Sequence, residues 1–148
     1  MKVTIDGQEI EVAPGTTILQ AARMIGGESV PPAMCYYSKL KGTGGKCRCC
    51  LVDVTKEGME IASTKSDRVK EARKAVTEFL LINHPLDCPV CDQAGECDLQ
   101  NLSFEHGKSE TRFIEEKRTF EPEDIGPYIQ LHMNRCIVCQ RCVEVADQ

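Results

Sequence analysis

The segment spanning residues 84–97, HPLDCPVCDQAGEC, constrains the fold of this chain more than any other. It presents one imidazole and three thiols, on His84, Cys88, Cys91 and Cys97. Pro85 and Pro89 exclude a continuous helix, because each lacks an amide proton and restricts the preceding residue. Gly95 permits a tight reversal. A segment that can neither form a helix nor bury much surface is expected to take its shape from a metal centre. One histidine with three cysteines is also an ordinary zinc set, so zinc and an iron–sulfur cluster both stay open here.

The remaining cysteines gather into two further groups. The chain of 148 residues has ten cysteines, at positions 35, 47, 49, 50, 88, 91, 97, 136, 139 and 142. The N-terminal MKVTIDGQEI has no apolar core, so we expect no signal peptide, and no run approaches the ~18 apolar residues of a membrane span. Clustered thiols in such a chain indicate metal binding rather than disulfides. The net charge of −5 argues against nucleic-acid binding.

The C-terminal group has the most specific spacing. Its ligands are Cys136, Cys139 and Cys142, each separated by two residues. This is how a peptide wraps one [4Fe–4S] cluster, whereas structural zinc sites more often use two distant Cys-x-x-Cys pairs. Two-cluster ferredoxins continue with x3-Cys-Pro. Here Ala146-Asp147 stands in that place, so we expect the fourth ligand elsewhere, in a longer protein.

The first group follows the logic of plant-type [2Fe–2S] proteins. Its ligands are predicted to be Cys35, Cys47 and Cys50, with Gly42, Gly44 and Gly45 allowing backbone amides to approach a cluster. A fourth thiolate is required, and no further cysteine follows before Cys88. Neighbours in an extended segment point to opposite faces, so Cys49 is predicted to be a buried apolar residue and not a ligand.

Together the three groups favour iron–sulfur clusters over zinc. The set His84, Cys88, Cys91 and Cys97 is then expected to hold a complete [4Fe–4S] cluster. Alone, His84 would be a turn residue before Pro85; in register with three thiols it is expected to be a ligand. A neutral histidine ligand should raise the reduction potential, as in Rieske centres. His106 and His132 are predicted to be surface residues, although His132 could lie beside the ligands of the C-terminal group.

Regular elements are predicted around these groups. Residues 2–13 have the pattern of a β-hairpin with an Asp6-Gly7 turn. A helix should follow Thr17, with Gln20 completing a capping box, and end at Gly26. Strands are expected at residues 51–54 and near Met59 and Ile61, a short helix after Cys97, and a connector with at most one short strand at residues 105–127.

A second long helix is predicted over residues 66–82. Its apolar face comprises Val69, Ala72, Val76, Phe79 and Leu80. Its charged face, expected to be solvated, comprises Lys70, Glu71, Arg73, Lys74 and Glu78.

With these residues in hand, the chain resembles the N-terminal part of the large iron–sulfur subunit of respiratory complex I (the G type). The matching stretches are VPPAMCYYSKLKGTGGKCRCCLVDV, EFLLINHPLDCPVCDQAGECDLQN, EEKRTF and LHMNRCIVCQRCV. The resemblance implies a [2Fe–2S] cluster on Cys35, Cys47 and Cys50, and a [4Fe–4S] cluster on His84, Cys88, Cys91 and Cys97. It also implies a further [4Fe–4S] cluster on Cys136, Cys139 and Cys142.

The resemblance further implies an α+β fold in three parts. These are a β-grasp ferredoxin-like domain (residues 1–65), a small helical [4Fe–4S] domain (66–105), and a connector with the start of another [4Fe–4S] domain (106–148). The chain would relay single electrons within NADH dehydrogenase, with no substrate-converting site of its own. Its partners would be a flavin-containing NADH-oxidising subunit and other iron–sulfur subunits. It would lie on the cytoplasmic side of the inner membrane, as a peripheral subunit that reaches the membrane only through the complex.

The chain departs from that family at one ligand. The family's fourth [2Fe–2S] cysteine lies between a strand like residues 51–54 and a segment like EGMEI. Here only Thr55 and Lys56 separate the two, which indicates a deletion. Counting forward from Cys50 would instead place Thr64 at the ligand position, as a substitution.

Two other functions compete with this one. The first is the same relay in an NAD-linked hydrogenase or formate dehydrogenase; Ala146, where hydrogenase-type subunits tend to carry a further cysteine, favours complex I. The second is a zinc-stabilised interaction module without a redox role.

Overall fold

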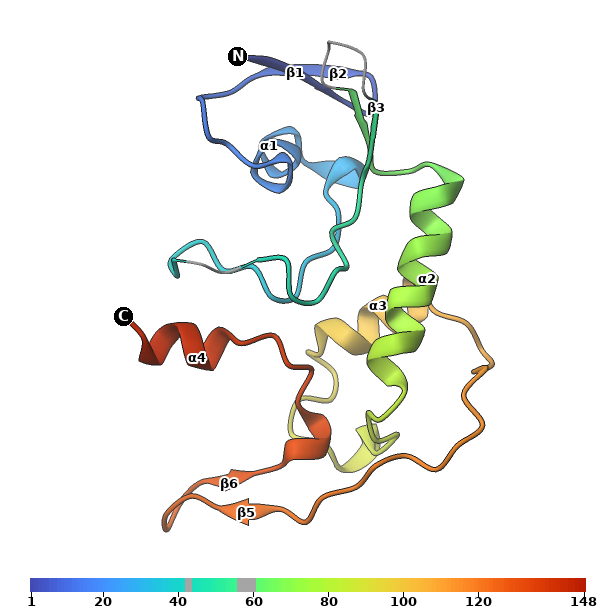
Figure 1. The fold of residues 1–148 in the computed structure, drawn as a ribbon, viewed down its shortest axis with the longest axis vertical. Helices are drawn as coiled ribbons and strands as arrows, with labels where there is room; N and C mark the ends of the chain where they lie inside the picture. The colour runs from blue at the N-terminus through green and yellow to red at the C-terminus, as the bar shows by residue number, and fades with distance from the viewer. Residues whose placement is uncertain (42–43, 56–60) are drawn as a thin grey trace.

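The computed structural model describes residues 1–41, 44–55 and 61–148. Its N-terminal part contains a four-stranded mixed sheet in the order β2-β1-β4-β3, with β1 and β4 parallel at its centre (Figure 1). The strands span Lys2–Ile5 (β1), Gln8–Glu11 (β2), Asp53–Thr55 (β3) and Ile61–Ser63 (β4). The mixed α and β character predicted from the sequence is confirmed.

The predicted hairpin and first helix are both present. Asp6 and Gly7 form the turn between β1 and β2, with φ values of 49° and 81°. Helix α1 (Ile18–Ile25) has the full capping box between Thr17 and Gln20, and Gly26 ends it. The helix packs on the sheet through a small apolar core made of Ile5, Val12, Ala21, Ala22 and Ala62. This core is local, so the first part of the fold is stabilised by its own side chains.

The strand predicted at residues 51–54 is displaced. The ladder begins only at Asp53, and the carbonyl of Leu51 accepts a hydrogen bond from the Arg73 side chain instead of a strand partner. Strand β4 starts at Ile61. Met59, which was predicted to lie in the same strand, falls outside the described residues.

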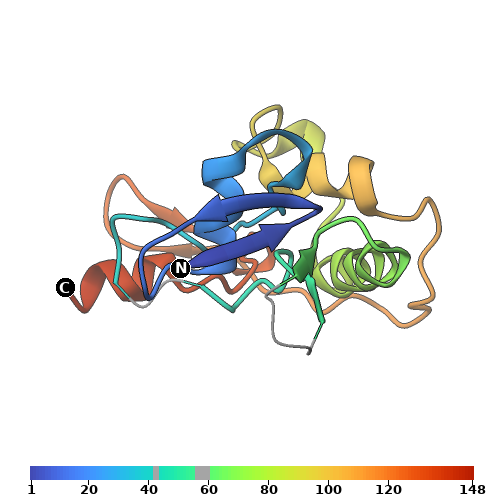
Figure 2. The same cartoon turned by 90° about the horizontal axis from the view of Figure 1, so that it is seen from above.

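Helix α2 (Asp67–Leu81) carries the chain from the sheet to the remaining cysteines, and runs beside the sheet, nearly end-on in Figure 2. Ser66 caps it by accepting a hydrogen bond from the Val69 amide at 3.3 Å. Its fully buried residues are Val69, Arg73 and Thr77, which are four apart and so share one face.

The face assignment on α2 was therefore wrong at three positions. Phe79 is 73% exposed, because it lies off the stripe that α3 and the first cysteine loop cover. Arg73 is buried, since its guanidinium bonds to the Leu51 carbonyl. The Glu78 side chain is only 10% exposed and is covered by the guanidinium of Arg112, which holds the pKa of Glu78 at about 2.

A second core joins the two halves of the chain. Helix α3 (Asp98–His106) forms where a short helix was predicted, and its Leu99 and Leu102 pack against α2 and the first cysteine loop. The buried members of this core are Met34, Cys35, Cys47, Cys49, Leu99 and Leu102.

The C-terminal part has little core of its own. It comprises β5 (Glu123–Asp124), β6 (Gln130–Leu131) and α4 (Arg141–Ala146), and β5 is the one short strand allowed for in the connector. None of residues 103–148, all of which are described, is fully buried. The described helices include none long and apolar enough to cross a membrane.

The hairpin turn is bound to the end of β4 by hydrogen bonds between half-buried Asp6 and buried Thr64. Asp6 Oδ1 accepts from the Thr64 amide at 2.7 Å, and Oδ2 accepts from its hydroxyl at 2.6 Å. Burial acts to raise the pKa of Asp6, but the hydrogen bonds from Thr64 outweigh it and the pKa is lowered. The Thr64 hydroxyl is thus occupied by Asp6.

We expect Asp6→Asn to cost about 1–3 kcal/mol of the free energy of unfolding at pH 7, because it weakens bonds to a charged acceptor. Since the folded-state pKa is depressed, this stabilisation is complete above the unfolded pKa of about 3.9 and fades as pH falls through the folded value. Urea unfolding at pH 7 and near pH 3 measures both effects. The control is Asp67→Asn, whose carboxylate is fully exposed. Equal losses in the two variants at pH 7 would contradict the assignment.

Candidate metal centres

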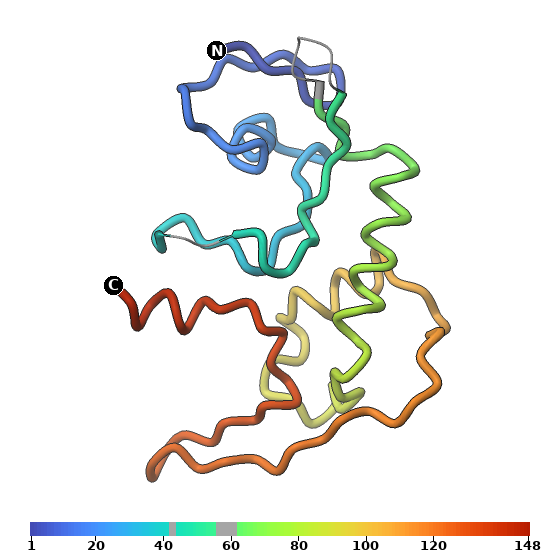
Figure 3. The backbone as a smooth tube through the Cα atoms, viewed as in Figure 1, coloured from blue at the N-terminus to red at the C-terminus, as the bar shows by residue number. Residues whose placement is uncertain are grey.

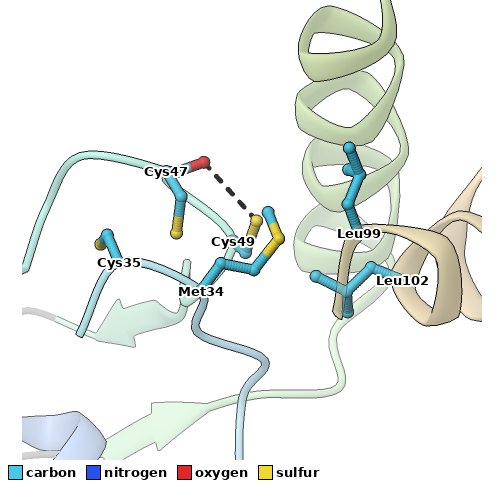
Figure 4. Close-up of a cluster of buried hydrophobic side chains, with 6 residues drawn as sticks. All are labelled: Met34, Cys35, Cys47, Cys49, Leu99 and Leu102. Atoms are coloured by element: carbon cyan, nitrogen blue, oxygen red, sulfur yellow. Dashed lines mark hydrogen bonds between the residues drawn. The ribbon is translucent and has the colours of Figure 1, made fainter. Parts of the chain in front are cut away.

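The first cysteine group lies in the loop that connects α1 to β3. Cys35, Cys47 and Cys49 are buried there, at 1–3% exposure, and Cys50 is half-buried. Figure 4 shows the three buried cysteines beside Met34, with Leu99 and Leu102 of α3 closing the other side. The loop is not extended: Arg48 has a left-handed φ of 62°, and residues 49–50 form a turn. This sharp path places Cys35, Cys47 and Cys49 in one buried cluster.

The surroundings of Cys47 favour its thiolate. Hydrogen bonding from Cys49 is the largest cause that lowers the pKa of Cys47 to about 4; burial opposes it, and backbone hydrogen bonds from Cys49, Cys35 and Met34 act in the same direction as Cys49. Cys50 has a raised pKa, first because of burial and then because of the charges on Cys47 and Cys35. Amides directed at a ligand sulfur are what a loop built to hold an anionic cluster requires.

Arg73 is the buried cation of this group. Its Nη2 donates to the Leu51 carbonyl at 3.2 Å, while its buried Nε has no hydrogen-bond partner among the described residues. Burial lowers its pKa, and the nearby Cys50, Asp6 and Cys49 oppose that shift. Sequence reasoning missed this residue, although its position four residues after Val69 places it on the apolar stripe.

Arg73→Ala is expected to lower the free energy of unfolding by about 2 kcal/mol, because it removes a charged hydrogen bond and leaves the Leu51 carbonyl unpaired. Arg68→Ala is the matched control, since the Arg68 side chain is 85% exposed and should contribute less than about 0.5 kcal/mol. Denaturant titration of both variants measures the difference. A cost for Arg73→Ala no greater than that of the control would refute a structural role for the buried guanidinium.

The second group follows α2 directly. Its four predicted ligands are all half-buried, namely His84, Cys88, Cys91 and Cys97. A single 3-10 turn, Cys88–Val90, places two of the thiols, Gly95 turns the chain with a φ of 85°, and Cys97 is the N-cap of α3. Across the described residues, no three His, Cys, Asp or Glu side chains meet closely enough to chelate one metal ion.

One cation binds the backbone on both sides of the turn that leads to His84. Lys117, from the EEKR stretch, donates to the carbonyls of Leu81 and His84 at 2.7 and 2.8 Å. Sequence reasoning placed Lys117 only in a connector. Burial lowers the pKa of His84, with Lys117 and Arg135 acting in the same direction against Asp87. The neutral imidazole favoured in this way is the form that binds metals.

The third group is the most exposed. Cys136 and Cys142 are exposed, whereas Cys139 is half-buried and packs against the core of the first group. Val138 and Gln140 both have left-handed φ values, 55° and 61°, so the chain winds tightly between the cysteines. Such winding is compatible with three thiols wrapping one cluster.

An ion pair joins the second and third groups. Arg135 Nη2 donates to Asp87 Oδ2 at 2.7 Å, and its Nε donates to the same oxygen at 3.1 Å. Both side chains adjoin predicted ligands, Cys88 and Cys136. This contact lowers the pKa of Asp87 and raises that of Arg135.

All three groups therefore meet in space. A cavity of about 800 Å³ has Cys47, His84 and Cys136 among its lining residues, one from each group. Arg141, at the start of α4, donates to the Tyr36 carbonyl at 3.4 Å, and Gln148 reaches the Lys41 carbonyl. Figure 3 shows this C-terminal helix alongside the first cysteine loop.

The two other histidines were predicted to be surface residues, but they are less exposed than that. Both are half-buried, and the Nδ1 of His132 is buried without a hydrogen-bond partner among the described residues. His106 is the last residue of α3, and its side chain is 26% exposed.

The donor sets fit iron–sulfur clusters to different degrees. The second group offers four ligands, of which three are thiols. The third offers three thiols. The first offers the three ligands predicted from the sequence and a further thiol, buried, on Cys49.

Three family models match successive parts of the chain. Residues 1–75 match the 2Fe-2S iron-sulfur cluster binding domain. Residues 73–112 match the NADH-ubiquinone oxidoreductase-G iron-sulfur binding region, and residues 126–148 match the ferredoxin-like domain of NADH-quinone oxidoreductase subunit 3. The models cover each of the three cysteine groups.

Curated relatives are similar over almost the whole chain. The G subunit of NADH-quinone oxidoreductase from Rickettsia bellii is 48% identical and that from Rickettsia felis 47%, each over 99% of this chain and 23% of the relative. The chain thus spans about a quarter of the length of these relatives. The aligned stretch has 159 positions against 148 residues here, so at least 11 positions have no counterpart in this chain. The predicted site of the deletion, between Val54 and Glu57, reaches into residues 56–60, which lie outside the described part.

A solved structure shares the fold. One chain of an NAD+-reducing [NiFe]-hydrogenase in the H2-reduced state superimposes with a TM-score of 0.85 at 28% identity. The match covers 99% of this chain and 66% of the hydrogenase chain.

Proposed function

We propose an electron-relay function from one premise: the chain belongs to the family of 2Fe-2S iron–sulfur cluster binding domains, and it corresponds to the N-terminal part of the G subunit of NADH-quinone oxidoreductase. In this proposal it passes single electrons from a flavin-containing, NADH-oxidising subunit towards quinone. The clusters, when bound, supply the one-electron redox chemistry. The residues of this chain hold them, bury them and set their electrostatic surroundings.

The ligand assignments are part of the proposal. Cys35, Cys47 and Cys50 would hold a [2Fe–2S] cluster in a β-grasp domain (residues 1–65). The second group would hold a [4Fe–4S] cluster in a helical domain (66–105), with His84 as its one neutral ligand. Cys136, Cys139 and Cys142 would supply three ligands to a further [4Fe–4S] cluster in residues 106–148. The whole would be a peripheral subunit on the cytoplasmic side of the inner membrane.

The observation that carries this proposal is the meeting of three cysteine groups that lie far apart in the sequence. Cys97 and Cys139 pack against the core that contains Cys35 and Cys47. Such packing suits electron transfer, because each centre then has a neighbour across buried protein instead of across water. A zinc-stabilised interaction module, the alternative without a redox role, has no need for three adjoining sites.

The same relay in an NAD-linked hydrogenase is the second candidate. The superposition on the NAD+-reducing hydrogenase chain favours it. The relatives from NADH-quinone oxidoreductase, at 45–48% identity against 28%, favour the quinone-linked complex.

The test is EPR spectroscopy on the anaerobically reconstituted chain. We expect a signal from a reducible [4Fe–4S] centre, and Cys91→Ser should abolish or alter it. Asp92→Asn, a change at the exposed neighbouring residue, should leave it intact. A colourless protein with stoichiometric zinc, or a signal unchanged in Cys91→Ser, would overturn the proposal.

A further inference from the structure

The first cysteine group contains a fourth thiol whose surroundings differ from those predicted. Cys49 was excluded as a ligand because neighbours in an extended segment point to opposite faces. The structure removes that reason: residues 49–50 form a turn, entered through the left-handed backbone of Arg48. Cys49 and Cys50 are therefore not forced apart.

Cys49 lies among the other thiols of its group. Its side chain is 3% exposed, and its Sγ lies 3.5 Å from the Cys47 carbonyl oxygen. Cys35 and Cys47 belong to the same buried cluster as Cys49. In Figure 4 the sulfurs of Cys35, Cys47 and Cys49 follow one another along the inner side of the loop.

The other thiols and the threonine considered for this position are engaged elsewhere in the described part of the chain. The sequence has no cysteine between Cys50 and Cys88, and the Thr64 hydroxyl is bound to Asp6. Cys97 and Cys139 pack against this core, but each belongs to another cysteine group. Cys49 is the remaining buried thiol of the loop.

We propose that Cys49 is the fourth ligand of the [2Fe–2S] site, in place of the cysteine that this chain lacks. The proposal rests on the electron-relay function. The cluster has two irons, and each iron has two protein ligands. The four ligands are then Cys35, Cys47, Cys49 and Cys50. On binding, the Cys49 thiol releases its proton to solvent and its sulfur bonds to iron, so no oxidant or reductant is consumed.

The experiment compares variants of the full chain, reconstituted anaerobically. Cys49→Ala should lose the EPR signal of the reduced [2Fe–2S] cluster. It should also lose about two irons and two sulfides per chain. Cys50→Ala should do the same, as loss of a ligand predicted from the sequence. Met34→Leu is the packing control, because Met34 is buried in the same core but bears no thiol; it should keep the cluster. Cys49→Ser, which preserves size, should lose the signal or shift its g values.

Three results would overturn the assignment of Cys49. These are a wild-type chain with no [2Fe–2S] signal, a signal unchanged in both Cys49→Ala and Cys49→Ser, and loss of the signal in Met34→Leu. In each case the [4Fe–4S] signal reports separately on the relay function. If that signal is absent from the wild type, the relay itself fails.

Discussion

Removing iron from the chain is expected to unfold residues 84–97 and 132–148 while leaving the N-terminal sheet and α1 folded. The two parts differ in what stabilises them. Helix α1 and the sheet share an apolar core that needs no metal. In contrast, residues 92–96 are all exposed, and no residue from 103 to 148 is fully buried. Contacts this sparse cannot offset the conformational entropy of ordering the chain.

We expect bound clusters to supply the missing free energy. A structural zinc site contributes on the order of 10 kcal/mol to folding, and we expect a cluster bound by four residues to contribute similarly. The ion pair between Arg135 and Asp87 is too accessible to replace it, because partly exposed pairs are screened by solvent.

Hydrogen exchange monitored by mass spectrometry measures this directly. Peptides from residues 84–97 and 132–148 should lose protection in the iron-free chain, whereas those from residues 1–30 should keep it. Uniform protection with and without iron would show that side-chain packing, and not metal, holds the ligand segments in place.

His84→Cys is expected to lower the reduction potential of the [4Fe–4S] centre by about 100 mV. A cysteine ligand is anionic and histidine is neutral, so the substitution disfavours adding an electron. Rieske centres have two histidine ligands, and their reduction potentials lie at least about 250 mV above those of plant-type ferredoxins. One histidine ligand is therefore expected to account for about half of that difference. The half-buried position of His84 limits solvent screening of that charge.

An EPR-monitored redox titration gives the potential. His106→Cys is the matched control, because His106 lies at the far end of α3 from Cys97 and should leave the potential unchanged. An unchanged or raised potential in His84→Cys would exclude this histidine as a ligand.

Local patterns predicted most of the regular structure. The Asp6-Gly7 hairpin and the Thr17–Gln20 capping box formed as expected, since each depends on residues close in sequence. The start of α2 near Ser66 and the start of α3 after Cys97 also followed. Cysteine spacing alone divided the candidate metal-binding residues into three groups.

Features that depend on residues far apart in sequence were not predictable. Arg73 looked like a solvated helix residue, and only the packed loop reveals its bond to Leu51. Lys117 was placed in a connector, yet its side chain donates a hydrogen bond to the carbonyl of His84. The orientation of Cys49 depended on the backbone of Arg48, where a non-glycine residue adopts positive φ and no sequence signal indicates it.

The most direct test of iron–sulfur binding is the amount of iron, acid-labile sulfide and zinc in the anaerobically purified chain. The [4Fe–4S] centre on residues 84–97 predicts about four irons and as many sulfides per chain, and the [2Fe–2S] site about two more of each. Stoichiometric zinc with no sulfide would contradict the claim that these cysteines hold iron–sulfur clusters.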